Sequence, residues 1–292
     1  MPKRVNKAIE LLEADQPVFY TGSHTTSDLN YDAGREMAKT WADYINIGME
    51  HGCFDLSGLD SYMRGMADGG PTNSGHKTPA VIVELPVDGV SADVIRANGW
   101  QMRQLLARGV HGLLLCHAES PEAVKAFVEA CRYPFQTIGV GTQLDVGRRG
   151  SAGQGPASHI WGVSVDQYLD TADPWPLNPK GELLLGLKFE NKRALANVEM
   201  TARVPGIAFA EWGPGDMSMS FGYKHPPNPR PQELQDARDR VFAACQSAGL
   251  KFLESASPDT IEASIDAGVR ICGSGEETAS IGRAYAGRTM PV

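Results

Sequence analysis

The sequence predicts a (β/α)8 TIM barrel. Short apolar runs alternate along the chain with stretches of helical spacing, and eight such pairs are typical of a closed parallel sheet covered by helices. No GxGxxG motif follows the first apolar run, which disfavours an open dinucleotide-binding sheet. No Ser-, Pro- or charge-rich linker divides the 292 residues, so we expect residues 1–292 to form a single domain.

The first half of the chain supplies four of the eight expected strands. Each is a short apolar run bounded by polar or turn-forming residues. After the fourth run, Ser120 and Pro121 are the residue types preferred at the N-cap and the first position of a helix. Strands are expected at 17–24, 44–48, 79–84 and 112–117, and helices at 5–14, 31–43, 92–107 and 120–132.

The second half begins with a long insertion and then resumes the alternation. Residues 133–180 are rich in Gly, Pro and aromatic side chains without regular spacing, and irregular segments of this length are usually functional or disordered. Their Trp and Tyr content disfavours simple disorder. Strands are then expected at 183–190, 206–212, 251–256 and 269–274, and helices at 191–202, 230–248, from 257 onward, and at 276–286.

The composition disfavours several classes of partner. The formal net charge is −8 and Lys and Arg form no cluster, which argues against nucleic acids and anionic membranes. No apolar run approaches the roughly 20 residues of a membrane span, and the first residues do not resemble a signal sequence. We therefore expect a cytoplasmic protein that binds a small polar molecule.

The five cysteines indicate reduced thiols, because their number is odd and no CxxC spacing occurs. Cys116, Cys131, Cys245 and Cys272 lie in apolar strand-like or helical runs, where we expect them to be core residues. Cys53 alone is close to candidate chemistry. No neighbouring feature marks it as an activated nucleophile.

Two carboxylates follow expected strands and suggest a divalent-metal site. Glu190 closes the run Leu-Leu-Leu-Gly-Leu-Lys-Phe-Glu, and Asp216 follows Ile-Ala-Phe-Ala-Glu-Trp-Gly-Pro-Gly. In a (β/α)8 barrel, residues just past the strands form the active-site face. Two carboxylates there are costly unless a cation neutralises them. The structural alternative is that each carboxylate caps the following helix or pairs with a nearby Lys.

The chain resembles the HpcH/HpaI aldolases, which are metal-dependent class II pyruvate aldolases related to the citrate lyase β subunit. The resemblance covers roughly residues 17–285, and its most specific part is the segment Gly-Pro-Gly-Asp-Met-Ser-Met-Ser-Phe-Gly-Tyr. The motifs that carry it are Glu50-His51, Arg148-Arg149-Gly150, Phe189-Glu190 and Gly213-Pro214-Gly215-Asp216.

The resemblance implies that Glu190 and Asp216 bind Mg²⁺, Mn²⁺ or Co²⁺, which are hard ions that suit oxygen ligands. The ion would act as a Lewis acid that stabilises an enolate. His51 matches the general base, and histidine suits proton transfer near neutrality. Glu50 is expected to brace the turn. Either arginine of the Gly-Arg-Arg-Gly stretch could orient an anionic group of the substrate, with Arg148 in substrate binding and Arg149 among the catalytic residues.

Three departures from the family pattern predict altered chemistry or an altered substrate. Gly48 stands where the family has an acid that pairs with the base, and Ala107 replaces an Asp of a Leu-Leu-Asp-x-Gly pattern. Glu84 stands where the family has an Arg that steadies the keto-acid oxygen, and an anion there would repel pyruvate. Glu84 is therefore a candidate third carboxylate near the metal or a replacement base.

Other strand-end residues are candidates for substrate contacts. Lys188 lies two residues before Glu190, so both side chains should point to the same side of the strand, where Lys188 could neutralise Glu84. A Schiff base at Lys188 is disfavoured, because nearby carboxylates favour its protonated form. His24 and His117 lie at the ends of the first and fourth expected strands. Each could contact the substrate, or could be a structural histidine whose hydrogen bonds are satisfied within the protein.

Aromatic side chains are candidates for a pocket wall. Trp212 is the best placed, beside Gly213 and Pro214, which we include among the substrate-binding residues. An aromatic or bulky substrate becomes plausible if such rings line the site. Trp161 and Trp175 fit better as anchors of the long insertion.

We therefore expect a divalent-metal-dependent carbon–carbon lyase of the retro-aldol type that acts on a hydroxy-carbonyl compound. The alternatives are a metal-dependent hydrolase, a decarboxylase or a CoA-ester lyase on the same site, or a barrel that binds a ligand without catalysis. The resemblance also implies a homotrimer or homohexamer. The final helix, 276–286, either is exchanged between subunits or docks on its own barrel.

Overall fold

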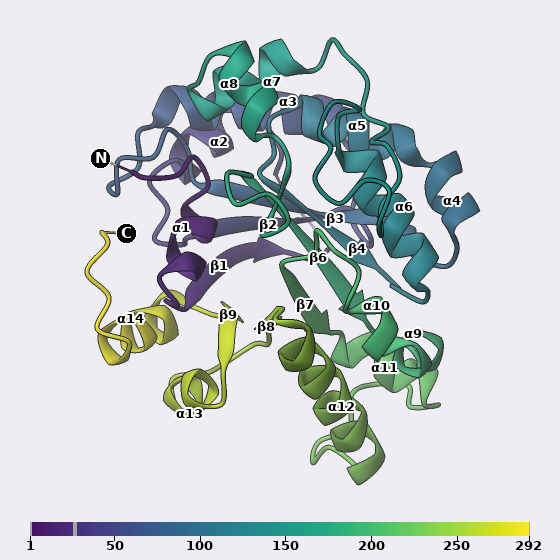
Figure 1. Ribbon diagram of the computed structural model, residues 1–292. Coiled ribbons are helices and arrows are strands. Elements are labelled where there is room, and N and C mark those ends of the chain that lie inside the picture. Colours follow the sequence, from purple (N-terminus) through teal and green to yellow (C-terminus); the bar gives the residue numbers. More distant parts are fainter. Residues whose placement is uncertain (1, 26–27, 292) are drawn as a thin grey trace.

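The computed structural model describes residues 2–25 and 28–291, and its centre is a closed ring of eight parallel strands surrounded by helices (Figure 1). Neighbouring strands pair in the order β4-β3-β2-β1-β9-β8-β7-β6, and pairing of β4 with β6 closes the ring. The predicted (β/α)8 barrel is thus confirmed. The ring strands are β1 (Val18–Ser23), β2 (Tyr44–Gly48), β3 (Ala80–Asp88), β4 (Gly112–Cys116), β6 (Leu183–Phe189), β7 (Phe209–Trp212), β8 (Lys251–Leu253) and β9 (Val269–Gly273).

The helices follow the strands in the expected alternation, and local capping explains several of their starts. The Ser120 hydroxyl accepts a hydrogen bond from the Ala123 N–H, with Pro121 in the first turn, as the sequence predicts. The helices are α1 (Lys7–Glu13), α2 (Tyr31–Met37), α3 (Leu56–Gly69), α4 (Ala92–Ala97), α5 (Gly99–Ala107), α6 (Pro121–Cys131), α7 (Gln154–Trp161), α8 (Val165–Thr171), α9 (Lys192–Ala196), α10 (Val198–Thr201), α11 (Pro214–Ser220), α12 (Gln232–Ala248), α13 (Ile261–Asp266) and α14 (Glu276–Tyr285).

Two apolar layers hold the barrel together. The larger lies between the strands and the outer helices, and the smaller fills the barrel interior with alternate strand residues such as Tyr44, Ile82 and Phe209. Helix α1 adds its apolar residues to the interior cluster. Its N-cap Asn6 donates to carbonyls that precede β4 and β6, so α1 closes the amino end of the barrel. The carboxyl end is left for polar side chains.

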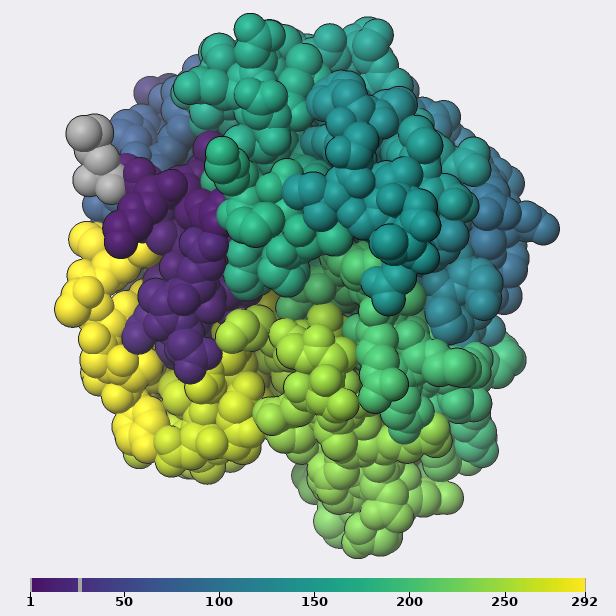
Figure 2. All heavy atoms as spheres, in the orientation of Figure 1, coloured from purple at the N-terminus to yellow at the C-terminus, as the bar shows by residue number. Residues whose placement is uncertain are grey.

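A buried ion cluster joins the chain termini at the amino end. Asp43 is fully buried and accepts two hydrogen bonds of 2.7 Å from Arg288, while Lys7 and Arg283 lie within 3.1 and 3.6 Å. Burial would raise the pKa of Asp43, but the attraction of Arg288 and Lys7 outweighs it and the pKa lies below its usual value. Figure 2 shows the N-terminal and C-terminal segments side by side. Within the chain, Arg283 of helix α14 lies over the ring of Phe19.

The structure differs from the sequence expectation in four places. The insertion 133–180 is partly regular, since it contains α7, α8 and the short strand β5 (Pro174–Trp175), which pairs with β6 outside the ring. Helices α3 and α11 were not predicted. The expected helices 92–107 and 191–202 are each broken in two at an asparagine. Strand β3 continues to Asp88 through a register shift after Glu84.

None of the helices in residues 2–25 and 28–291 is long and apolar enough to cross a membrane. Among the cysteines, Cys53 is exposed and the other four are buried and free, as the sequence predicts.

Candidate active site at the carboxyl end of the barrel

A cavity lined by charged, polar and apolar residues opens at the carboxyl ends of the strands, as expected for a barrel of this type. Its volume is about 370 Å³. The side chains that line it come mainly from the ends of β1, β2, β6, β7 and β8 and from the segments that follow them. They are His24, His51, Lys188, Glu190, Glu211, Trp212, Gly213, Pro214, Gly215, Asp216, Arg230, Glu254 and Ser255.

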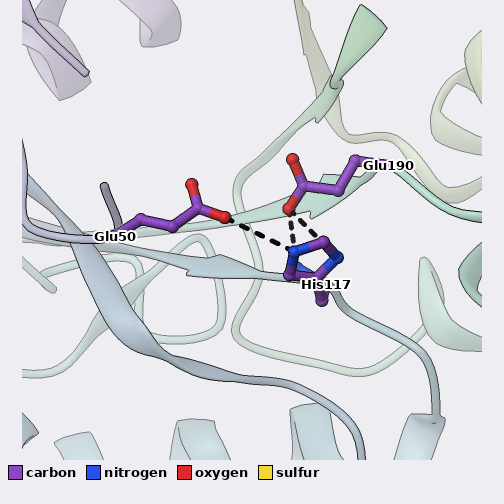
Figure 3. Close-up of side chains that lie close together, drawn as sticks. All are labelled: Glu50, His117 and Glu190. Carbon is purple, nitrogen blue, oxygen red and sulfur yellow. Dashed lines mark hydrogen bonds and ion pairs between the residues drawn. The ribbon is translucent and has the colours of Figure 1, made fainter. Parts of the chain in front are cut away.

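Glu190 belongs to a compact group with Glu50 and His117 (Figure 3). One potential ligand atom from each residue lies within 4.8 Å of the other two. The His117 ring lies between the carboxylates, with Nε2 3.6 Å from Glu50 Oε1 and Nδ1 3.8 Å from Glu190 Oε1. The His117 backbone N–H also donates to Glu190 Oε1 at 2.8 Å. The group therefore offers two carboxylates and an imidazole to one point.

Local backbone geometry fixes the His117 ring. His117 follows β4 with φ +46°, a left-handed conformation that is uncommon outside glycine and typical of functional sites. Asn191 lies 3.0 Å from His117 Nδ1 through its Nδ2 atom and also donates to Glu119. The ring is thus held from the side of β6, and its Nε2 atom faces Glu50.

Asp216 belongs to a second group, with Glu50 and His51. His51 Nε2 lies 3.5 Å from Glu50 Oε2 and 3.7 Å from Asp216 Oδ2. Asp216 sits in the first turn of α11, where the helix dipole favours a carboxylate and Pro214 begins the helix. Glu190 and Asp216 therefore line one cavity as expected, but each belongs to a different three-residue group, and Glu50 is common to both.

Lys188 is the buried cation of the site. Its Nζ atom donates to Glu50 Oε2 at 2.6 Å and lies 3.6 Å from Glu190 Oε2 and 4.0 Å from Glu84 Oε2. Burial would lower the pKa of Lys188, but the surrounding anionic groups, Glu190 among them, raise it above its usual value. Lys188 is therefore protonated, on the same side of β6 as Glu190, and disfavours Schiff-base chemistry as the sequence analysis expects.

Glu84 is buried and engaged, and it does not line the cavity. Its Oε1 atom lies 2.6 Å from His24 Nδ1 and accepts a 2.9 Å hydrogen bond from Asn46. Burial would raise the pKa of Glu84, but the hydrogen bond to His24 and the charge of Lys188 lower it. Glu84 is thus a neutralised support for His24 and Lys188, rather than an anion directed into the cavity.

The negative form of the remaining carboxylates of the site is incompletely stabilised by the protein. Burial, with repulsion from Glu50, raises the pKa of Glu190 despite the attraction of Lys188. Burial also raises the pKa of Glu211 to about 7, against the attraction of Lys188 and with added repulsion from Glu84. One buried lysine therefore does not offset the carboxylates that surround it.

A divalent cation fits this chemistry. Buried carboxylate oxygens without a hydrogen-bond partner are rare, because an unpaired buried polar atom is costly. Here Glu190 Oε2 and Glu50 Oε1 are both buried and accept no hydrogen bond. Oxygen ligands, with an imidazole, suit Mg²⁺, Mn²⁺ or Co²⁺. Gly213 provides room for this arrangement, since a Cβ atom there would lie 2.6 Å from the Glu190 carboxylate.

The predicted substrate-binding residues divide into two sets. Five of them line the cavity: His24, Lys188, Trp212, Gly213 and Pro214. Arg148 and Arg149 do not. Arg148 is half-exposed beside Glu129 of α6, with its Nε atom 3.9 Å from Glu129 Oε2. The placement of the Gly-Arg-Arg-Gly stretch in this chain thus differs from the expectation that it orients the substrate.

Arg149 is held inside the insertion by aromatic rings. Its guanidinium lies 4.5 Å from the ring centre of Tyr133 and contacts Tyr168, and Nη2 donates to the Leu106 carbonyl at 3.4 Å. Only 3% of Arg149 is exposed. This burial gives Arg149 a structural role in the chain, since it ties the insertion to the end of α5.

Gly48 has a steric explanation. A Cβ atom at this position would lie 2.2 Å from the backbone oxygen of His24. The close approach of β1 and β2, which delivers His24 to the cavity, therefore leaves no room for an acidic side chain at residue 48. Glu50 and Asp216 stand beside His51 instead, and they supply the orienting partners that the sequence did not identify.

The aromatic residues offer little surface to a ligand. Trp212 is 3% exposed, and the guanidinium of Arg230 covers its ring at 4.6 Å. Trp161 donates from Nε1 to the Gly109 carbonyl at 2.9 Å and anchors α7, as expected. The cavity lining therefore mixes charged side chains with Trp212, Gly213 and Pro214, and Trp212 is the one tryptophan among the described residues that lines it.

Sequence reasoning missed or undervalued four residues of the site. Glu50 was assigned to the turn, and His117 was left open between a polar contact and a structural role. Glu211 and Arg230 were not singled out. Glu50 and His117 both follow a buried strand, and this position could have identified them. The residues around Arg230 in the sequence do not indicate that it reaches the cavity.

The comparisons with known proteins agree with this architecture. The family model described as HpcH/HpaI aldolase/citrate lyase matches residues 81–282. A hydroxypyruvate/pyruvate aldolase of Pseudomonas aeruginosa is 28% identical over 211 residues, which are 71% of this chain and 65% of that protein, under two thirds of its length. A hydroxypyruvate/pyruvate aldolase of Sagittula stellata is 29% identical over 244 residues, 82% of this chain and 80% of that protein.

Solved structures match over nearly the whole chain. The crystal structure of an HpcH/HpaI aldolase/citrate lyase family protein from Burkholderia cenocepacia is 23% identical, with a TM-score of 0.69 and 95% of both chains covered. An HpcH/HpaI aldolase from Desulfitobacterium hafniense is 17% identical, with a TM-score of 0.66, and covers 94% of this chain and 93% of that one. At these identities the likeness concerns the fold.

Proposed function

This chain belongs to the HpcH/HpaI aldolase/citrate lyase family, and we propose that it is a divalent-metal-dependent carbon–carbon lyase that cleaves a hydroxylated 2-oxo acid. The observation that carries the proposal is the buried excess of carboxylates at the strand ends, with unpartnered oxygens on Glu190 and Glu50. Relatives named hydroxypyruvate/pyruvate aldolase and 4-hydroxy-2-oxovalerate aldolase support a 2-oxo acid as the carbonyl component.

Glu190 and Asp216 are the proposed metal ligands; Glu50 belongs to the three-residue group of each, and His117 to the group of Glu190. When bound, a divalent ion would polarise the substrate carbonyl and offset the charge of the enolate. The ligands come from segments after different strands, and this leaves one side of the group open to the cavity.

His51 is the proposed acid–base residue. It takes the proton of the substrate hydroxyl, the carbon–carbon bond breaks, and an aldehyde leaves while the bonding electrons form the enolate. Return of a proton to the enolate carbon gives the 2-oxo acid product. Half-exposure of the His51 ring, at 45%, and its 3.5 Å separation from Glu50 suit a group that must exchange protons and keep a fixed orientation.

Lys188 is the proposed substitute for the cation that the family has on the third strand. Glu84 occupies that place, but His24, Asn46 and Lys188 neutralise it. Lys188 lines the cavity and lies 3.6 Å from Glu190, so a substrate oxyanion near the metal ligands would meet a positive charge. This arrangement removes the electrostatic objection to a 2-oxo acid.

The test is exchange of the C3 protons of pyruvate and hydroxypyruvate in deuterated water, followed by mass spectrometry with Mg²⁺, Mn²⁺ or Co²⁺. We expect exchange with metal, none with EDTA, and at least a loss of about 10-fold in Asp216→Asn, since substitution even of residues that only support metal ligands typically costs about 10- to 100-fold. Asp236→Asn, on the exposed face of α12, is the matched control. Metal binding without exchange of either compound would refute the 2-oxo acid proposal.

A further inference from the structure

We propose that His24 is a further catalytic residue, the group that gives a proton to the enolate carbon after the carbon–carbon bond breaks. The inference rests on the proposed lyase function, in which His51 takes the hydroxyl proton and this second proton has no assigned donor. His24 follows β1 and lines the same cavity as Glu190 and Asp216. Its side chain is 45% exposed, so the ring is open to both a ligand and solvent.

A buried carboxylate fixes the His24 ring. His24 Nδ1 lies 2.6 Å from Oε1 of Glu84, whose side chain is 1% exposed. The same oxygen accepts a hydrogen bond from Asn46, and the other Glu84 oxygen lies 4.0 Å from Lys188 Nζ. Because Glu84 holds the Nδ1 edge, Nε2 on the opposite edge is the ring atom left for a ligand. A carboxylate that binds Nδ1–H is a known means of orienting an acid–base imidazole.

The charges around His24 favour its protonated form. The hydrogen bond to Glu84 raises the pKa of His24 above its usual value, although burial opposes it. Glu211 at the end of β7 adds attraction, Lys188 adds repulsion, and the Tyr20 ring packs edge-on at 6.5 Å. A protonated imidazole can donate from Nε2, and its half-exposure allows solvent to restore the proton.

The support of His24 is independent of the proposed metal ligands, in contrast to that of His51. The carboxylates beside His51 are Glu50 and Asp216, at 3.5 and 3.7 Å, and both belong to the three-residue groups of the site. Among the described residues, Glu84 belongs to neither group, so its hold on His24 does not compete with a cation. The two histidines therefore suit two separate proton transfers.

The barrel brings His24 to the cavity from the side opposite Glu190. In the ring of strands, β1 lies four strands from β6 in either direction. Glu84 nevertheless reaches both His24 and Lys188, and Lys188 lies 3.6 Å from Glu190, so the two sides meet at the centre of the cavity. An enolate held near Glu190 would present its carbon across the cavity to His24.

The proposed step moves one proton. The electron pair of the enolate double bond forms a new C–H bond with the proton from His24 Nε2, the enolate oxygen becomes a carbonyl oxygen, and the imidazole becomes neutral. Solvent then returns a proton to the ring. In the reverse direction, neutral His24 takes a C3 proton from a 2-oxo acid and exchanges it with solvent.

The test is exchange of the C3 protons of pyruvate and hydroxypyruvate in deuterated water with Mn²⁺. Neither compound carries an aldol hydroxyl, so exchange isolates the transfer assigned to His24. In His24→Gln we expect kcat for exchange to fall about 100-fold with KM within about 3-fold, because an acid–base group typically contributes about 10²- to 10⁴-fold. The loss in His51→Gln should be at least about 10-fold smaller. His159→Gln is the matched control, because His159 is an exposed histidine of α7.

Glu84→Gln tests the positioning residue through the pH dependence of exchange. Neutral His24 must accept the C3 proton, so the rate rises with pH through the pKa of His24. The variant removes the charge whose hydrogen bond raises that pKa, and the midpoint should move to lower pH. Glu277→Gln, at an exposed carboxylate of α14, should keep the wild-type midpoint.

Three results would overturn the proposal. A loss in His24→Gln confined to KM would show that His24 binds the ligand without carrying a proton. An equal or greater loss of exchange in His51→Gln would assign the transfer to His51, and an unchanged midpoint in Glu84→Gln would remove the support from Glu84. Absence of exchange in the wild-type protein would instead refute the lyase function itself.

Discussion

The two ends of the barrel both bury charged side chains, but with opposite balance. At the amino end one carboxylate, Asp43, faces the cations of Lys7, Arg283 and Arg288. Both oxygens of Asp43 accept hydrogen bonds, from Arg288 and from the Phe19 N–H. The cluster is self-contained, and it ties the N-terminal helix to the C-terminal segment. Its role is stability, in keeping with the usual division of labour in these barrels.

At the carboxyl end the ratio is reversed. One buried cation, Lys188, serves several buried carboxylates. Among the described residues, Glu50, Glu84, Glu190 and Glu211 each keep a buried oxygen without a hydrogen bond. The pKa of Asp43 is lowered, whereas burial raises the pKa of Glu190 and Glu211. The difference teaches that the protein can neutralise a buried carboxylate where only structure is required. At the carboxyl end the buried carboxylates are not fully neutralised, and carboxylates in that state can bind a cation.

The largest expected effect is on the amino-end cluster. Asp43→Asn leaves Lys7, Arg283 and Arg288 together without their counter-ion, and removal of one partner from a buried ion network typically costs about 3–5 kcal/mol. We expect the free energy of unfolding in urea to fall by that amount. Asp15→Asn is the matched control, since Asp15 pairs with Lys251 and Arg270 on the surface and should cost about 1 kcal/mol or less. Equal losses in the two variants would show that the buried cluster does not stabilise the fold.

The next effect concerns Glu211 and pH. The pKa of Glu211 is raised by burial to about 7, so the folded protein holds a proton that the unfolded chain releases near its ordinary pKa. This contribution to stability is complete below the unfolded pKa and is lost as the pH rises through the folded pKa. In EDTA we expect this contribution of Glu211 to the free energy of unfolding to fall by up to about 3 kcal/mol between pH 5 and pH 8. Burial lowers the pKa of His111 to about 3, so His111 contributes in the opposite direction over the same interval.

Glu211→Gln isolates that contribution, because the amide keeps the shape and does not titrate. The difference in free energy of unfolding between the variant and the wild type should change by about that amount over this interval, as measured by urea titrations at each pH. Glu277→Gln, an exposed carboxylate in the first turn of α14, provides the comparison. A pH dependence in Glu211→Gln that is the same as in the wild type would contradict the raised pKa of Glu211.

Much of the barrel and part of its carboxyl end could be predicted from the sequence. The run Tyr44–Gly48 matches β2, and Glu190 and Asp216 both reach the cavity. These successes share a physical cause. Parallel strands in a closed barrel end on the same face, so a polar residue placed directly after an apolar run is delivered there regardless of the details of packing.

The site residues that escaped prediction depend on long-range contacts. Glu50 is drawn into the cluster by Lys188, which is 138 positions away. Arg230 is directed to the cavity by stacking on Trp212. The placement of Arg149 has the same origin, since Arg149 belongs to the Gly-Arg-Arg-Gly motif but lies between Tyr133 and Tyr168 of the insertion. No periodicity or local spacing encodes these partners.

The third effect tests whether a cation restores the balance at the carboxyl end. A ligand that binds only the folded state stabilises it by about 2.7 kcal/mol at 100 times its dissociation constant. We expect Mn²⁺ to raise the free energy of unfolding of the wild-type protein by about that amount, and to have little effect on Glu190→Gln.

In EDTA we expect Glu190→Gln to be at least as stable as the wild type, because the amide relieves repulsion from Glu50. Glu199→Gln, which alters an exposed pair with Arg240, should respond to Mn²⁺ like the wild type. If Glu190→Gln were less stable than the wild type in EDTA and still gained from Mn²⁺, Glu190 would be a structural carboxylate like Asp43, and the contrast between the two ends of the barrel would not hold.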